Sequence, residues 1–332
     1  MKHRSIYNCL IAIAALLTWN SCNNEWEDEQ YEQLVSLKAP TNDNTPVTQI
    51  RLKYKGDTVT HYNLPVIVSG TTVNSKDLDV HIGIDLDTLN IYNKEHFYER
   101  KDLYFRQLTS SFYEIPDSVV RIPAGKSTAL LDIQFKFKGL DLSDKWVLPL
   151  IVKDSPSYNY QSHPRKDYNN ALLWITPFND YSGDYGTTNL SIYTDKSNKP
   201  IVVSNRTAYV VDENSVFFYA GATKETREDR RFFKITAAFQ AQTDSTGTVS
   251  LQTENPDLHL NVIGQPTYYI TKMMDNARPT LLRRTVTINL EYEFEDPLET
   301  PGYIIKYRAK GTMSLQRNIN TVIPDEEFAI EW

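Results

Sequence analysis

The chain has 332 residues, a formal net charge of -7 at pH 7 and two cysteines, Cys9 and Cys22. An acidic chain without a basic run is not expected to bind nucleic acid, and so few thiols exclude a disulfide framework. Tyr outnumbers Gly by 21 to 12, and abundant aromatic residues favour strands. A chain of this length exceeds what one core usually supports, so we expect two domains.

The N-terminus has the pattern of a lipoprotein signal peptide. Two basic residues precede an unbroken apolar run at 10–17 that is too short to span a bilayer, and a small residue stands directly before Cys22. We predict a signal peptide at 1–21 and acylation of Cys22 by palmitate or a similar chain, which anchors the protein to a membrane. The acidic residues that follow predict an extended tether at 22–32, which has too little apolar surface to pack.

The first half of the chain reads as short strands bounded by turn residues. In the run at 128–137, the apolar residues Leu131, Ile133 and Phe135 share one face, which predicts a half-buried antiparallel strand. The number and spacing of the runs predict an immunoglobulin-like β-sandwich at 33–177. The runs are 47–54, 59–69, 77–85, 119–123, 128–137, 146–153 and 171–176.

One segment of the first half breaks this pattern. The apolar residues of 87–99 recur at helical spacing, and Asp87 or Thr88 is a candidate N-cap. We expect a short helix that crosses over between strands.

The second half reads as a long meander. Pro177 is expected to end the preceding strand because its ring removes a ladder donor. We predict a C-terminal domain at 178–332, either an antiparallel β-barrel of lipocalin-like form or a second β-sandwich, and prefer the barrel. The strand-like runs are 186–194, 201–205, 207–212, 215–220, 232–242, 249–253, 258–262, 267–274, 285–294, 303–315 and 328–332.

Like charges recur on one side of a strand in the second half. Glu291, Glu293 and Glu295 share that side, and three carboxylates cannot be buried unpaired. The side must therefore face water or cations, either as the outer face of a sheet or as a wet lumen.

Several segments resemble a family of Bacteroidetes surface lipoproteins. They are Tyr-Asn-Leu-Pro-Val-Ile-Val-Ser-Gly at 62–70, Val-Arg-Ile-Pro-Ala-Gly at 120–125, Lys-Trp-Val-Leu-Pro-Leu at 145–150 and the Asp-Tyr-Ser-Gly opening at 180–183. The resemblance implies an immunoglobulin-like first domain, a gene in a polysaccharide-utilisation cluster and capture of carbohydrate at the cell surface. The resemblance does not identify any binding residue in this sequence.

Patterns that carry catalysis or metal binding do not stand out. The sequence has no Gly-x-Ser-x-Gly turn and no His pair at zinc spacing, and no free thiol remains in the mature chain once Cys22 is acylated, so we predict no catalytic residue, metal or cofactor. A glycosidase needs two facing carboxyl groups, and no acidic pair among the 42 acidic residues is marked out by its neighbours.

Aromatic residues in polar, turn-rich segments are the candidate sugar platforms, because a sugar presents flat apolar faces ringed by hydroxyls. Tyr158, Tyr160 and Tyr168 lie in such a segment at 155–168. Tyr268 and Tyr269 follow a Gly-Gln-Pro turn, which places one of the two rings on the exposed side of a strand.

Together these features predict a non-enzymatic glycan-binding lipoprotein on the outer face of the outer membrane. Its expected partners are a polysaccharide or oligosaccharide, the membrane through Cys22, and an outer-membrane transporter with its lipoprotein partner. Two alternatives stay open, namely a structural or protein-interaction subunit of a surface complex and, more weakly, a glycoside hydrolase.

Overall fold

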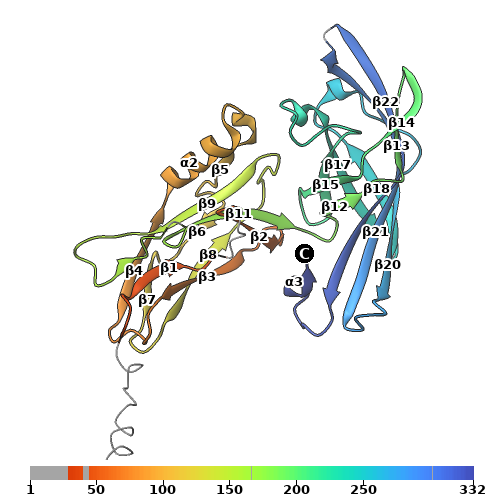
Figure 1. Cartoon of the computed structure of the whole chain (residues 1–332). Helices are drawn as coiled ribbons and strands as arrows, with labels where there is room; N and C mark the ends of the chain where they lie inside the picture. Colours follow the sequence, from red (N-terminus) through yellow and green to blue (C-terminus); the bar gives the residue numbers. More distant parts are fainter. Residues whose placement is uncertain (1–28, 40–44, 166, 301) are drawn as a thin grey trace, which may run out of the picture.

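The structure of the protein is a computed structural model, and it describes residues 29–39, 45–165, 167–300 and 302–332. The predicted signal peptide, Cys22 and most of the acidic tether lie outside these ranges. Nearly all regular structure in the described ranges is strand, which confirms the all-β prediction (Figure 1). Among the helices described, none is long and apolar enough to cross a bilayer.

The first domain consists of two packed sheets. One sheet has the order β10-β1-β3-β8-β6, with β1 at Leu34–Leu37, β3 at Thr60–Val68, β6 at Tyr113–Glu114, β8 at Thr128–Phe135 and β10 at Gln161–Ser162. The other has the order β2-β11-β9-β4-β7, with β2 at Val47–Lys53, β4 at Leu78–Ile84, β7 at Val119–Ile122, β9 at Lys145–Val152 and β11 at Asn170–Phe178; β5 at Phe105–Gln107 pairs with β9.

Alternation along the strands builds the core between these sheets. Leu131, Ile133 and Phe135 of β8 are buried, and β8 pairs antiparallel with β3, as the sequence predicts. Leu173 and Ile175 of β11 enter the same core from the opposite sheet. The intervening side chain, Trp174, therefore points away from the core.

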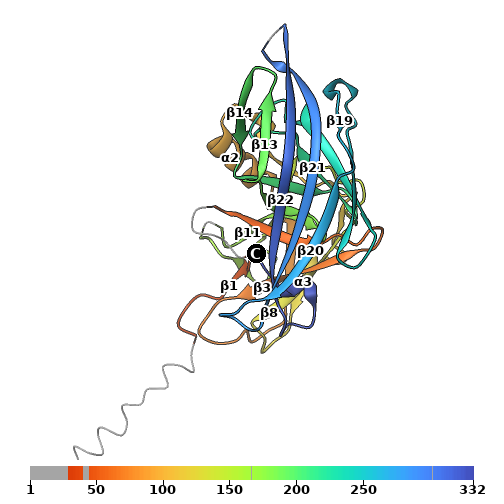
Figure 2. The ribbon, with the colours of Figure 1, turned by 90° about the vertical axis from the view of Figure 1, so that its right-hand side faces the viewer.

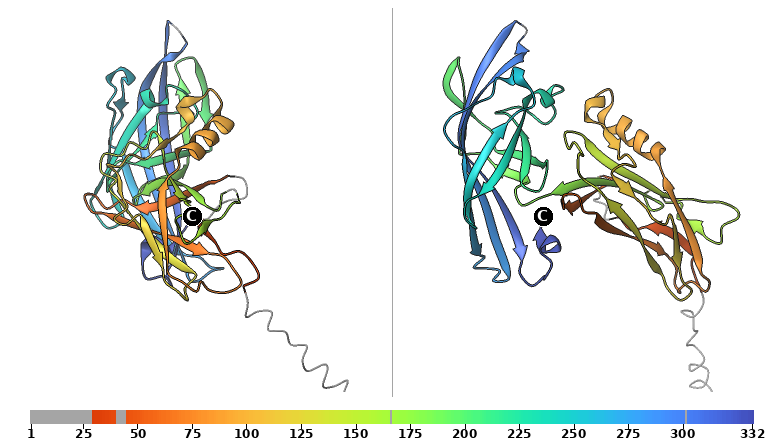
Figure 3. Two further views of the ribbon diagram at one scale, coloured as in Figure 1. Left: turned by 90° about the vertical axis from the view of Figure 1, so that its left-hand side faces the viewer. Right: turned by 180° about the vertical axis from the view of Figure 1, so that it is seen from behind.

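The predicted crossover helix is α2 at Leu86–Phe97, between β4 and β5. Its N-cap is Asp85, whose carboxylate accepts the N–H of Thr88 at 3.0 Å, so the expectation of Asp87 or Thr88 as cap is wrong. The helix lies on the outside of the first domain (Figure 3), and its residue Leu89 belongs to a small apolar cluster that is separate from the main core.

Pro177 does not end its strand, contrary to the prediction. β11 continues to Phe178 and pairs in parallel with β2 over its whole second half. The ladder to β9 stops at Trp174, so beyond that point β11 has a partner on one side only and tolerates the missing N–H.

The second domain is one twelve-stranded sheet in which β21 at Leu281–Thr300 and β22 at Tyr303–Asn320 form a long hairpin (Figure 2). Its order is β14-β13-β22-β12-β15-β16-β17-β18-β20-β21-β19, and the additional β21–β22 pairing returns that order to β22, which closes the sheet. The remaining strands are β12 at Gly183–Gly186, β13 at Leu190–Thr194, β14 at Ser197–Val202, β15 at Asn205–Val210, β16 at Ser215–Tyr219, β17 at Lys234–Ala241, β18 at Thr246–Gln252, β19 at Asn261–Val262, β20 at Thr267–Met274 and β23 at Ile330–Glu331.

The glutamates singled out in the sequence lie on the outer face of β21. Leu290, Tyr292 and Phe294 alternate with them and belong to the buried core of the domain. In the register of the hairpin, Glu291 lies opposite Lys310, Glu293 opposite Arg308 and Glu295 opposite Lys306. The expectation that this side sees water or cations is confirmed, and the side does not line a lumen.

Two end segments differ from the predictions. The run at 328–332 is a short helix, α3 at Glu326–Ala329, followed by the two-residue strand β23. At the other end, the carboxylate of Glu29 accepts the backbone N–H groups and hydroxyls of Thr71 and Thr72 at 2.7–3.0 Å. The tether is therefore attached to the first domain at Glu29, which the sequence did not indicate.

Candidate functional site between the domains

A cleft of about 600 Å³ is lined by residues of both domains, among them the C-terminal residue Trp332. The C-terminus lies between the two domains (Figures 1 and 3). The first domain contributes the outward faces of β2 and β11, the end of α2 and the turn before β9. The second domain contributes β12, β15, β22 and the loop at 225–230.

Strand register explains the first wall. Trp174 lies opposite Gln49, and Thr176 opposite Arg51, in the parallel ladder of β11 and β2. Residues opposite one another in a ladder point to the same face, and the adjacent residues Leu173 and Ile175 fill the core. The four outward side chains therefore form one surface, where Gln49 donates to the Thr176 hydroxyl at 3.2 Å.

Aromatic rings line the cleft from both domains. Phe178 and Trp332 meet edge to face, with ring centroids 4.9 Å apart, and Trp332 is 54% exposed. Exposed rings beside polar groups are the surface that a sugar requires. The aromatic residues of the lining are Phe97, Tyr104, Trp174, Phe178, Tyr209, Tyr219 and Trp332.

Cations lie against these rings. The Arg51 guanidinium is 4.8 Å from the centroid of Trp332, and the Arg317 guanidinium is 5.3 Å from the same centroid. The Lys145 ammonium lies 5.4–5.8 Å from three rings, including Trp174. Burial lowers the pKa of Lys145, and the nearby charge of Arg230 lowers it further.

Glu225 carries an unsatisfied oxygen in the cleft. Its Oε2 accepts the Tyr209 hydroxyl at 3.0 Å, whereas its Oε1 is buried and has no hydrogen-bond partner among the described residues. Burial raises the pKa of Glu225 although three cations, Arg206, Arg230 and Lys145, act in the opposite direction. A buried orphan acceptor is costly, and a ligand donor would satisfy it.

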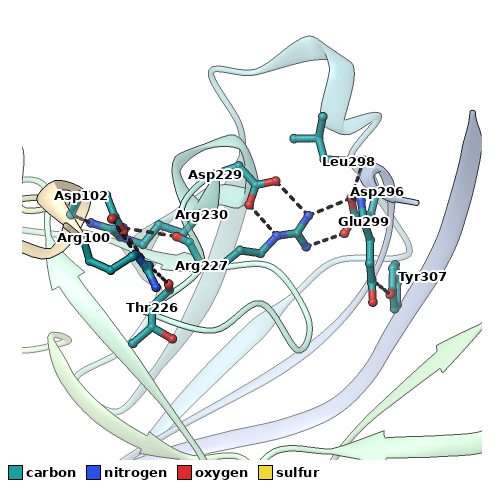
Figure 4. A network of polar contacts seen from close by, with 10 residues as sticks. All are labelled: Arg100, Asp102, Thr226, Arg227, Asp229, Arg230, Asp296, Leu298, Glu299 and Tyr307. Atoms are coloured by element: carbon teal, nitrogen blue, oxygen red, sulfur yellow. Dashed lines mark hydrogen bonds and ion pairs between the residues drawn. The ribbon is translucent and has the colours of Figure 1, made fainter. Parts of the chain in front are cut away.

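Arg230 and Arg100 join the two domains at the edge of the cleft (Figure 4). Arg230 donates to the backbone carbonyl of Asp102 at 2.8 Å, and its guanidinium lies 3.5 Å from the Asp102 carboxylate. Arg100 binds the same carboxylate at 2.8–2.9 Å and reaches across to the Thr226 carbonyl. These contacts fix the loop at 225–230 against the first domain.

A second hollow, of about 680 Å³, lies within the second domain on the same loop. Figure 4 shows Arg227 between Asp229 and Asp296, and the Tyr307 hydroxyl donates to Glu299 at 2.9 Å. Its central charged groups, Arg227, Asp229 and Asp296, therefore bind one another. The interdomain cleft, which keeps unpaired groups, is the better candidate site.

The tyrosines chosen from the sequence lie elsewhere. Tyr160 is 7% exposed, and its hydroxyl bonds to the backbone of His81 and Lys153; Tyr158 stacks on His81 and packs on the core. Tyr160 thus offers no free ring face, which corrects the expectation for that residue. Tyr168 is 40% exposed and does not line the cleft.

One of the adjacent residues Tyr268 and Tyr269 is buried and the other is exposed, as the sequence indicates. Tyr268 is 3% exposed and packs in the second core, so it is no platform, whereas Tyr269 is 47% exposed on β20. The two tyrosine segments belong to different domains and do not come together. Tyr158, which is half-buried, and the more exposed Tyr168 and Tyr269 stay predictions as glycan-binding residues.

Sequence reasoning missed the cleft because its residues are spread from Gln49 to Trp332. One signal was present: Trp174 stands among aliphatic residues at 171–175, and the alternate residues Ala171, Leu173 and Ile175 form the core. An outward Trp of this kind is a candidate binding residue.

Comparison with known proteins places the chain among Bacteroides proteins. The family model "Domain of unknown function (DUF4973)" matches residues 26–156, and a model described as a C-terminal domain matches residues 169–314. No protein of curated function matches.

Solved structures give a closer likeness. A Bacteroides ovatus protein of unknown function is 43% identical with a TM-score of 0.82, over 90% of this chain and 100% of that one. The chain belongs to the family of these Bacteroides proteins. Another member, a multidomain protein including DUF1735 from B. ovatus, is 42% identical with a TM-score of 0.81, over 90% of this chain and all of its own. A third member, described as an auxiliary nutrient binding protein from Bacteroides thetaiotaomicron, is 38% identical with a TM-score of 0.78, over 88% of this chain and 97% of its own.

Proposed function

We propose that the protein is a non-catalytic glycan-binding lipoprotein that captures saccharide in its interdomain cleft. The observation that carries the proposal is the cleft itself, where rings such as Trp174 and Trp332 stand beside unpaired polar groups such as Glu225 Oε1. The relative described as an auxiliary nutrient binding protein supports a capture role. Sugar C–H faces would stack on the rings, and sugar hydroxyls would meet the polar groups.

The proposal includes the location and architecture of the protein. Cys22 would carry the lipid, and the acidic segment after it would hold the protein on the outer face of the outer membrane, beside a transporter of a polysaccharide-utilisation system and its lipoprotein partner. A tethered binder raises the local concentration of a polymer, and weak contacts along one polymer reinforce one another. The two domains would be an immunoglobulin-like sandwich and a lipocalin-like barrel.

A non-catalytic role is supported by the state of the cleft carboxylates. Glycosidases need two carboxyl groups that are free to act on either side of the scissile bond. Arginines bind Asp102, Asp144 and Glu331, so only two side-chain carboxylates of the lining, Glu225 and Asp184, have no arginine partner among the described residues. We therefore expect binding without release of reducing ends.

The test is saccharide binding by the chain from residue 23 onward and by Trp332→Ala. Phe328→Ala is the matched control, because Phe328 is 74% exposed, close in sequence and outside the cleft lining. We expect Trp332→Ala to weaken binding roughly 3- to 10-fold, the equivalent of one aromatic contact of about 0.5–1.5 kcal/mol, and Phe328→Ala to have no effect. Equal effects of the two variants, or no saccharide binding by the parent chain, would contradict the proposal.

A further inference from the structure

Two arginines of the cleft lack the carboxylate partner that most arginines of the described residues have. Among the described residues, all but four arginines have a carboxylate within salt-bridge distance. The four exceptions are Arg51, Arg165, Arg206 and Arg317. Arg51 and Arg317 line the cleft. Arg206 donates to the carbonyls of Gly221 and Thr223, and its charge acts to lower the pKa of Glu225, which lines the cleft.

Lys145 adds a third unpaired cation to the lining. Its ammonium faces aromatic rings, and no carboxylate of the described chain lies within salt-bridge distance of it. Only Arg317 of the three is buried, at 5% exposed, and it donates to the backbone carbonyls of Asn179 and Ser182; Lys145 and Arg51 are exposed to solvent and are open to a ligand. In a chain with a net charge of -7, a cleft that presents exposed cations beside aromatic rings favours an anionic ligand.

The carboxylates of the lining do not supply that anion. Arginines bind Asp102 and Asp144, and Arg278 binds Glu331 at 3.0 Å. Burial raises the pKa of Glu225, which favours its neutral form. Asp184 accepts the Thr207 hydroxyl at 2.6 Å and lies beyond salt-bridge distance from Arg51; burial lowers the pKa of Arg51, and the charge of Asp184 offsets only part of this effect.

We propose that the ligand of the cleft is an acidic saccharide whose carboxylate or sulfate groups bind Lys145 and Arg51. This inference rests on the proposed glycan capture and narrows its substrate class. A guanidinium presents a planar fork that matches an oxyanion, and an ammonium acts as a point charge. Aromatic rings beside these cations, such as Trp174 and Trp332, would hold the apolar sugar face at the same time.

Calorimetric titration of the chain from residue 23 onward tests the inference with matched probes. Polygalacturonate is compared with its carboxyl-reduced form, and dextran sulfate with dextran, so that the two arms separate a carboxylate from a sulfate. Lys145→Gln and Arg51→Gln remove the cations. Lys196→Gln and Arg165→Gln are the controls, because Lys196 lies 3.6 Å from the ring of Tyr303 and Arg165 lies 4.9 Å from that of Tyr168, both outside the cleft.

We expect at least one acidic probe to bind more tightly than its neutral counterpart, with a loss of affinity as salt increases. Lys145→Gln and Arg51→Gln should each weaken that binding about ten-fold or more, the equivalent of one charge-assisted hydrogen bond, and the controls should not. Thermal melting checks that all four variants fold.

Two results would overturn the inference, and only the second would also contradict the proposed function. If the acidic and neutral forms bind equally and the cleft variants bind as the parent does, glycan capture stands but acidic selectivity is wrong. If no acidic probe binds and no neutral probe binds, the proposed function fails together with the inference.

Discussion

The contact between Arg230 and Asp102 offers a measurable test of how the two domains are held together. Arg230 lies in the loop of the second domain, is 7% exposed, and donates to the Asp102 carbonyl at 2.8 Å across the interface. Arg230→Met keeps the apolar stem and removes the charged donor. The Asp102 carboxylate stays bound to Arg100 at 2.8–2.9 Å, so it is not left as an unpaired buried charge.

The expected loss follows from that geometry. One charge-assisted hydrogen bond contributes about 1.5–3 kcal/mol, and the larger penalty of about 3–5 kcal/mol for orphaning a buried ion does not apply. We expect the free energy of unfolding to fall by about 2 kcal/mol and the melting temperature by roughly 4–8 °C. Urea unfolding followed by tryptophan fluorescence is suitable, because Trp174 and Trp332 lie in the cleft.

Arg121→Met is the matched control for this experiment. Arg121 is paired with Asp77 on the surface of the first domain, with its side chain 64% exposed, and such pairs contribute about 0–1 kcal/mol. If Arg230→Met is no more destabilising than Arg121→Met, the interface does not depend on this contact and the reasoning is refuted.

Three further changes have expected outcomes that thermal or urea unfolding can check. Gly311→Ala should destabilise the second domain by more than the roughly 1–3 kcal/mol of backbone strain, because Gly311 has φ +140° and an added Cβ would lie 2.0 Å from the Asn189 carbonyl oxygen. Gly302→Ala is the control for backbone strain alone, because Gly302 has φ +80° and open space around the added Cβ. Equal losses in the two variants would contradict the close contact at Gly311. Tyr160→Phe should cost about 1–3 kcal/mol by leaving the backbone groups of His81 and Lys153 unpaired, whereas Tyr168→Phe should be neutral. Hydrogen bonds from the backbone N–H groups of Arg278 and Ala277 lower the pKa of Asp275, so its carboxylate stabilises the fold fully above the ordinary aspartate pKa of about 4 and loses this effect as pH falls through the lowered pKa. Asp275→Asn should therefore lower the free energy of unfolding at pH 7 and match the parent in acid. A difference that stays constant with pH would contradict this.

Local sequence patterns predicted which segments form strands better than they predicted where those strands begin and end. The alternation of Leu131, Ile133 and Phe135 sufficed to identify β8, because burial on one face requires that period. The continuation of β11 through Pro177 was not predictable, because it depends on the absence of a second neighbour beyond Trp174. The length of β21 and β22 likewise follows from their pairing with each other over almost their whole extent.

The binding residues were harder to find than the strands. Aromatic density pointed to Tyr160 and Tyr268, yet hydrogen bonding and packing bury both. The cleft combines β2, β11, β15, β22 and the C-terminal residues, which long-range ladders bring together. No window of sequence contains that combination.

Hydrogen–deuterium exchange with a bound saccharide tests the central claim most directly. With the best-binding probe of the titration panel, we predict slower exchange in the cleft segments 174–178, 207–209, 225–230 and 315–317. The segments 155–168 and 267–274, which hold the tyrosines chosen from the sequence, should exchange as in the free protein. Protection confined to those two segments, with none in the cleft, would contradict the account.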